Sequence, residues 1–285
     1  MWRVPMIVLK KDRVRCLVTP AVGGSIAALA VDGVDLLRPA PVDNEDVLKS
    51  GCFPLVPFAN RVADARFTFD GERIEIEPDR EAPPHALHGH GWRAAWQVET
   101  AAEDRAVLRL DHKGGGWPWD YSARQILSLL PGGLNVVLEV TNRSARPMPL
   151  GLGLHPYFPA GATTRIAAAA RSIWLNDARG VADVVQEANP FAGDGADVPI
   201  GALLGLDNFF DGPVNGILIS SDASRIAVTS GEARGFHLYA PPGEDYVCLE
   251  PVTHVPNSFN DERQPGHQIV DPGATATIGM SIVRL

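Results

Sequence analysis

The stretch Gly132-Gly133-Leu134-Asn135-Val136-Val137-Leu138-Glu139-Val140 carries the pattern that decides the fold. A Gly-Gly step favours a tight turn, and a run of apolar and β-branched residues follows it directly. Asp32-Gly33 and Asp70-Gly71 are turn signals of the same kind. Further strand-like segments cover residues 14–19, 67–69, 73–76 and 106–110. Strand–turn–strand units without helices between them predict an antiparallel sandwich.

Helical signals are scarce in this sequence. Residues 167–170 are alanine-rich, but this segment is too short and too poorly capped to form an independent helix. The chain has no Gly-x-Gly-x-x-Gly or P-loop motif, no sustained heptads and no repeat of fixed period. We therefore predict an all-β fold, a large antiparallel β-sandwich, in a single domain over residues 1–285.

Composition narrows the class of partner. The chain has 285 residues, 45% of them hydrophobic and 21% charged, and a formal net charge of −9. No Lys/Arg-rich run is present, so neither nucleic acid nor an anionic membrane surface is expected as a partner. A neutral small molecule fits an acidic surface better.

Cysteine usage and the N-terminus indicate the compartment. The cysteines, Cys16, Cys52 and Cys248, are few, odd in number and far apart, which favours a reducing environment. Residues 1–14 lack the basic segment and cleavage site of a signal peptide and read as a first β-strand. No apolar run approaches the roughly 20 residues of a membrane span. We expect a soluble, cytoplasmic protein.

Two islands of sequence differ from the strand pattern in the first third of the chain. An apolar, proline-stiffened segment runs into Asn60-Arg61, where packing would hold a guanidinium ready to bind sugar oxygens, unless Arg61 is only a surface residue at a strand end. The second island places His85, His88 and His90 within a few positions. A His-x-His pair can chelate a metal, as in cupins, but the carboxylate that such sites need does not follow it.

Two later islands carry an acid–base pair. His155 ends a glycine-laced apolar run and precedes a proline, and histidine exchanges protons near neutral pH. Glu250 is expected at the end of an apolar strand, where partial desolvation raises the pKa of a carboxyl toward that of a general base. Between them, Asp207 lies beside aromatic residues, a combination common in sugar sites, although Asp-Asn-Phe-Phe is also an acceptable turn.

Taken in order, these islands resemble the aldose 1-epimerase (galactose mutarotase) family, and specifically a bacterial subgroup. The resemblance runs from Gly23-Gly24 to the Asp271-Pro272-Gly273 turn. It is carried by Asn60-Arg61 with Arg66-Phe67, by His88-Gly89-His90, by His155-Pro156-Tyr157-Phe158, by Asp207 before Asn208-Phe209-Phe210, and by Glu250. His90 replaces the second glycine of the family's His-Gly-Gly loop.

The resemblance implies a galactose mutarotase-like supersandwich and a role for each matched residue. Glu250 would be the general base and His155 the general acid, while Arg61, His88 and Asp207 would bind the substrate. The reaction would interconvert the α and β anomers of a free aldose. It would need no metal and no other cofactor, and the partner would be a monosaccharide. Both a monomer and a homodimer remain open.

Three alternatives stay open at this point. A hexose-6-phosphate mutarotase would need cations at the pocket mouth, for which Arg66 and Arg93 are candidates. A carbohydrate-binding or sugar-sensing module would bind without turnover. A metal-dependent β-fold enzyme would use His88 and His90.

Overall fold

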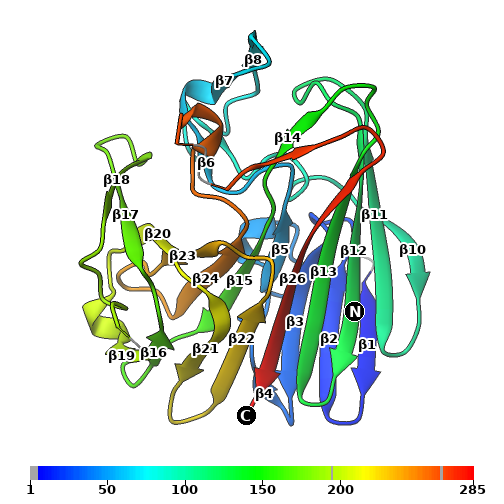
Figure 1. Ribbon diagram of the computed structural model, residues 1–285. Helices are drawn as coiled ribbons and strands as arrows, with labels where there is room; N and C mark the ends of the chain where they lie inside the picture. Colours follow the sequence, from blue (N-terminus) through cyan, green and yellow to red (C-terminus); the bar gives the residue numbers. More distant parts are fainter. Residues whose placement is uncertain (1–5, 194, 264–265) are drawn as a thin grey trace.

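The computed structural model describes residues 6–193, 195–263 and 266–285. Across these residues two large antiparallel sheets pack face to face (Figure 1). The predicted all-β antiparallel sandwich is therefore confirmed.

The larger sheet runs in the order β1-β2-β3-β5-β15-β24-β23-β20-β17-β18, and β4 pairs with β3. Its strands are β1 (Ile7–Lys11), β2 (Val14–Thr19), β3 (Ser25–Val31), β4 (Val34–Asp35), β5 (Cys52–Leu55), β15 (Gly153–Pro159), β17 (Ser172–Asn176), β18 (Ala182–Gln186), β20 (Asp207–Asp211), β23 (Gly235–Tyr239) and β24 (Tyr246–Val252).

The second sheet runs in the order β10-β11-β12-β13-β26-β22-β21-β16-β19. Its strands are β10 (Gln97–Ala101), β11 (Arg105–His112), β12 (Tyr121–Leu130), β13 (Gly133–Asn142), β16 (Arg165–Ala168), β19 (Ala196–Pro199), β21 (Val214–Ser220), β22 (Arg225–Ser230) and β26 (Thr275–Arg284).

Short elements connect the strands of the sheets, and β6, β7, β8 and β14 lie together at one end of the sandwich (Figure 1). The two-stranded pairs are β6 (Arg61–Val62) with β9 (Ala86–Leu87), β7 (Arg66–Phe69) with β8 (Glu72–Glu75), and β14 (Met148–Leu150) with β25 (Gln268–Val270). The single-turn 3₁₀ helices are η1 (Val47–Lys49), η2 (Ala63–Ala65), η3 (Ile200–Ala202) and η4 (Ser258–Asn260). No helix in the described part of the chain has the length and apolar character that crossing a membrane requires.

The turn residues act as their chemistry predicts. Asp32-Gly33 and Asp70-Gly71 both have positive φ at the two central positions, which is the geometry of a two-residue hairpin turn. Each joins two paired strands, β3 to β4 and β7 to β8. The alanine-rich residues 167 and 168 end strand β16. The expected first strand starts at Ile7, and residues 1–5 of the same segment lie outside the described part.

Alternation along the larger sheet separates a core face from an outer face. On β15, Leu154 and Phe158 belong to the main core between the sheets. The outer face carries a second buried cluster that includes Phe53, Tyr157 and Trp174. Because successive side chains of a strand point to opposite faces, every second residue of these strands is presented away from the core. The candidate site is built on that outer face.

Candidate active site

One lateral row of side chains crosses five adjacent strands of the larger sheet. Strand register places His155 opposite Phe53 on one side. On the other side, the pairs Gly153–Val252 and Tyr157–Cys248 align His155 with Glu250. Glu250 in turn faces His237, and His237 faces Phe209. Residues directly opposite one another in a sheet share a face and lie close together. The row therefore brings a carboxyl group and two histidines together from segments far apart in the chain.

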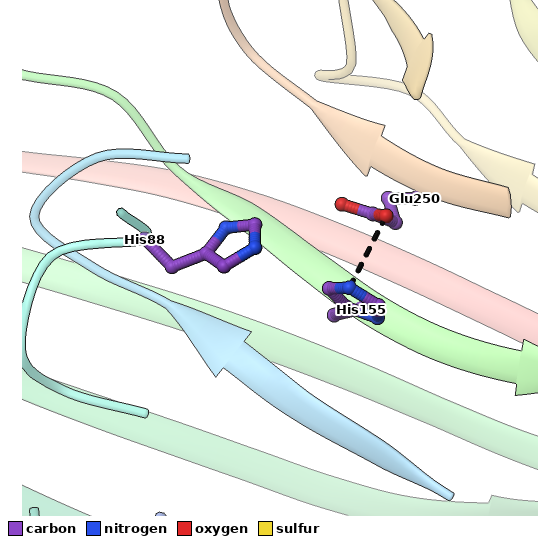
Figure 2. A group of neighbouring side chains, drawn as sticks. All are labelled: His88, His155 and Glu250. Atoms are coloured by element: carbon purple, nitrogen blue, oxygen red, sulfur yellow. Dashed lines mark ion pairs between the residues drawn. The ribbon is translucent and has the colours of Figure 1, made fainter. Parts of the chain in front are cut away.

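His155 and Glu250 form a buried pair at the centre of this row. The Nε2 atom of His155 lies 3.2 Å from Oε1 of Glu250, and the two side chains are 8% and 3% exposed. Figure 2 shows the two groups facing one another, with His88 approaching from a loop beside them. The remaining polar atom of each group, Nδ1 of His155 and Oε2 of Glu250, has no hydrogen-bond partner within the described residues. A buried pair with spare hydrogen-bonding capacity is suited to meeting a polar ligand.

The environment shifts the two pKa values in opposite directions. Burial raises the pKa of Glu250 well above its ordinary value, and the negative charge of Asp207 adds to this. Burial lowers the pKa of His155 to about 3, helped by the charge of His237. Together these shifts favour the neutral form of both groups.

Aromatic packing fixes the His155 ring. It stacks on Phe53 with ring centroids 4.5 Å apart and on Tyr157 at 4.7 Å. Phe53 stacks in turn on Trp92, which is fully buried. A ring held on both sides keeps its nitrogen aimed at Glu250, as acid–base catalysis requires.

His88 is presented by a turn and is fixed in one tautomer. His88 and Gly89 have positive φ values of 57° and 67°, which turn the chain after β9. The main-chain N–H of Asn60 donates to Nδ1 of His88 at 3.0 Å. Burial lowers the pKa of His88 well below its ordinary value, so the ring is neutral and its proton sits on Nε2. His88 therefore offers an N–H donor beside the Glu250–His155 pair.

The same tautomer argues against a metal at this position. Ligand atoms of His88, His155 and Glu250 all lie within 4.8 Å of one another, a spacing that a metal ion would fit. A metal, however, needs the lone pair of His88 Nε2, and the Asn60 N–H keeps the proton there. The arrangement is better suited to a hydroxyl group, which accepts from that N–H.

His90 does not join His88, so their pairing as metal ligands is not the arrangement found. The Nε2 atom of His90 lies 2.8 Å from the hydroxyl of Tyr121, and its ring lies 4.1 Å from that of His112. His90 and Gly89 line a separate cavity of about 1020 Å³, whose lining does not include His88. The loop therefore presents His88 to the candidate site and His90 to the separate cavity, with Gly89 between them.

Arg61 and Asp207 form a second wall of the site. Nη1 of Arg61 lies 3.5 Å from Oδ2 of Asp207. The other oxygen of Asp207, Oδ1, is 2.6 Å from Nε2 of His237. Burial alone would raise the pKa of Asp207, but the hydrogen bond and charge of His237, together with Arg61, lower it to about 2. Asp207 is therefore an ionised acceptor.

Histidines also support the irregular segment that carries Arg61. Main-chain N–H groups of residues 59, 60 and 64 donate to His254, His88 and His85, at 3.0, 3.0 and 2.9 Å. Asn60 and Asp64 have positive φ, so this segment cannot satisfy its own N–H groups by regular pairing. His85 and His254 thus hold the main chain beneath Arg61.

The structure brings together the five residues singled out from the sequence: Arg61, His88, His155, Asp207 and Glu250. One local expectation was wrong: Glu250 lies inside β24, two residues before its end. Asp207 opens strand β20, which excludes the alternative interpretation of Asp-Asn-Phe-Phe as a turn. Sequence reasoning missed His237, because Gly-Phe-His-Leu-Tyr reads as an ordinary strand.

Comparisons with known proteins agree with this geometry. The family model for aldose 1-epimerase matches residues 5–282. The uncharacterized protein YphB of Escherichia coli K12 is 32% identical over 272 residues, which cover 91% of this chain and 92% of YphB. The crystal structure of a candidate aldose 1-epimerase from Escherichia coli K12 superposes with a TM-score of 0.89 at 30% identity, covering 99% of each chain.

A more distant structure shares the fold. Galactose 1-epimerase from Lactobacillus acidophilus NCFM is 17% identical, with a TM-score of 0.81 over 98% of this chain and 93% of its own. The match of the family model over nearly the whole sequence, supported by the YphB relationship, establishes that this chain belongs to the aldose 1-epimerase family.

Proposed function

We propose that this protein is a mutarotase that interconverts the α and β anomers of a free aldose, with Glu250 as general base and His155 as general acid. The observation that carries the proposal is the buried Glu250–His155 contact of 3.2 Å, in which each group keeps one polar atom without a partner. Such a pair can remove a proton from one oxygen of a sugar and deliver one to another.

The reaction follows from proton transfer alone. Glu250 takes the proton of the C1 hydroxyl while His155 protonates the ring oxygen, and the bond from C1 to the ring oxygen breaks. Rotation about the C1–C2 bond exposes the other face of the aldehyde. Ring closure with the two roles reversed gives the other anomer. Each positioned proton transfer contributes on the order of 10²–10⁴-fold to the rate.

The pKa shifts favour the same proton distribution in the empty site and after ring opening. Once the ring has opened, Glu250 holds the proton and His155 is neutral. The raised pKa of Glu250 and the lowered pKa of His155 favour the same distribution. For ring opening to begin, the proton must move from Glu250 to His155 across their contact.

Three further residues would hold the sugar. His88 donates its Nε2–H to a sugar oxygen, Asp207 accepts from a hydroxyl, and Arg61 donates from its guanidinium. Preorganised donors of this kind stabilise charge that develops on oxygen during ring opening.

The charges near the site favour a free over a phosphorylated sugar. A phosphate dianion calls for unpaired cations. Arg93 is paired with Asp79 at 3.0 Å, and Arg66, half exposed, lies 3.8 Å from Asp64. Arg61 already faces Asp207.

Polarimetry on freshly dissolved α-anomers of several aldoses tests the proposal. We expect the wild type to accelerate the change in optical rotation and the Glu250→Gln variant to show no acceleration. Folded wild-type protein that accelerates mutarotation of no free aldose would refute the proposal. Acceleration of glucose 6-phosphate alone would indicate the phosphosugar activity, and sugar binding without turnover would indicate a binding module.

A further inference from the structure

Four polar side chains form a closed ring of contacts beside Glu250, which His237 faces across the sheet. Asp207 touches both His237 and Arg61. Arg61 Nη1 lies 3.5 Å from Oδ1 of Asn60. The Nδ2 atom of Asn60 then lies 3.4 Å from the His237 ring, which closes the circuit. His237 is the most deeply buried member of this ring, with 2% of its side chain exposed.

The partners of His237 fix how its protons are used. Its Nε2 atom faces a carboxylate oxygen at 2.6 Å and must donate to it. The amide of Asn60, which can only donate from Nδ2, lies 3.4 Å from both ring nitrogens and makes at most a weak contact with the ring. His237 therefore holds Oδ1 of Asp207 through its Nε2 atom.

The contacts of the ring are unequal in a way that points to a ligand. The His237–Asp207 contact is short, whereas Arg61 lies 3.5 Å from Asp207, beyond the usual range of about 2.7–3.2 Å for an N–H···O hydrogen bond. Oδ2 of Asp207 thus remains able to accept, and Nη1 of Arg61 remains able to donate. One hydroxyl group, which donates and accepts together, satisfies both.

We propose that His237 is a positioning residue that fixes Oδ1 of Asp207, so that Oδ2 and the Arg61 guanidinium grip one ring hydroxyl of the sugar other than the anomeric one. The inference rests on the proposed function, because it assigns a role within the same substrate site. It makes His237 a determinant of sugar specificity, although His237 itself touches no reacting atom.

The test combines variants of His237 with a series of deoxy sugars. His237→Phe keeps a ring of similar size but has no N–H, whereas His237→Gln retains a donor that reaches Asp207. His112→Gln serves as a matched histidine control outside the site. Mutarotation rates give kcat and KM for glucose and for its 2-, 3-, 4- and 6-deoxy analogues, or for the corresponding analogues of whichever aldose the wild type prefers.

We expect His237→Phe to raise KM for the full sugar by roughly tenfold or more while kcat changes by less than about threefold. On the single analogue that lacks the gripped hydroxyl, wild type and His237→Phe should have equal kcat/KM. His237→Gln should recover most of the affinity, and His112→Gln should match the wild type.

Other results separate the two levels of the proposal. Equal losses on every sugar, with no insensitive analogue, would show a merely structural role and overturn the inference, as would wild-type kinetics in His237→Phe. If that variant does not fold, as judged by its melting curve, His237→Asn replaces it, because the shorter amide does not span to Asp207. Wild-type protein inactive on all aldoses would instead overturn the proposed function itself.

Discussion

Replacing Glu250 by Gln should abolish mutarotation. It should also make the protein more stable than the wild type, by a margin that widens as pH rises. The change keeps the shape of the side chain and removes its ability to ionise. In the folded wild type the pKa of Glu250 is raised well above 4.5 by burial, then by the charge of Asp207. In the unfolded chain the carboxyl returns to its ordinary value.

The sign and size of the effect follow from proton linkage. Between the ordinary and the raised pKa, the folded protein keeps the Glu250 proton and the unfolded chain releases it. The unfolded state then binds fewer protons at Glu250. The contribution of this group to the free energy of unfolding of the wild type therefore falls by about 1.4 kcal/mol for each pH unit. Glu250→Gln lacks this loss. For a chain of this size the gap in melting temperature should widen by roughly 3 °C for each pH unit.

Melting curves of both proteins, measured by calorimetry in steps from about pH 5 upward, check this expectation. Glu187→Gln, a change at an exposed glutamate, serves as the control and should track the wild type. The gap should stop widening once Glu250 ionises in the folded state. Parallel curves for wild type and Glu250→Gln would refute the reasoning, because they would show that folding leaves the pKa of Glu250 unchanged.

His155→Gln should lower kcat by about 10³-fold or more in polarimetry with a small change in KM, because it removes the general acid; turnover near the wild-type level would remove His155 from the mechanism. Arg61→Lys should raise KM roughly tenfold, since an ammonium lacks the planar fork, and an unchanged KM would contradict its contact with the sugar. Activity should stay flat from neutral pH down to about pH 5, because a second proton on the pair belongs to His155, whose pKa is about 3; a decline centred near pH 6.5 would point to a different histidine. Treatment with a chelator followed by Zn²⁺ should leave the rate unchanged, because the tautomer of His88 disfavours metal binding, and loss with recovery would show metal dependence.

Local sequence chemistry was sufficient to predict the sandwich. The turn pairs Asp32-Gly33 and Asp70-Gly71 adopt the positive φ values that their residue types favour, and strands with period-two burial flank them. Such signals are short-range, so they specify hairpins. The order of the strands within each sheet depends on contacts between distant segments, which no local pattern reports.

The same division applies to the site. Arg61, His88 and His155 stand next to glycine, proline or irregular segments, which mark them in the sequence. His237 lies in an unbroken strand pattern, and its importance arises only from its register opposite Glu250. His254 acts through a main-chain N–H of a segment far away in sequence, a contact that leaves no trace in the residue types on either side.

The lateral row across the larger sheet makes turnover an indicator of folding accuracy. A slip of one residue in β24 would move Glu250 from the outer face to the apolar interior between the sheets. A misaligned molecule would therefore have no acid–base pair at all, and would bury a carboxyl among aliphatic side chains. Specific activity during refolding would thus measure the fraction of molecules whose strands are correctly aligned. It would do so independently of the β-structure content that circular dichroism measures.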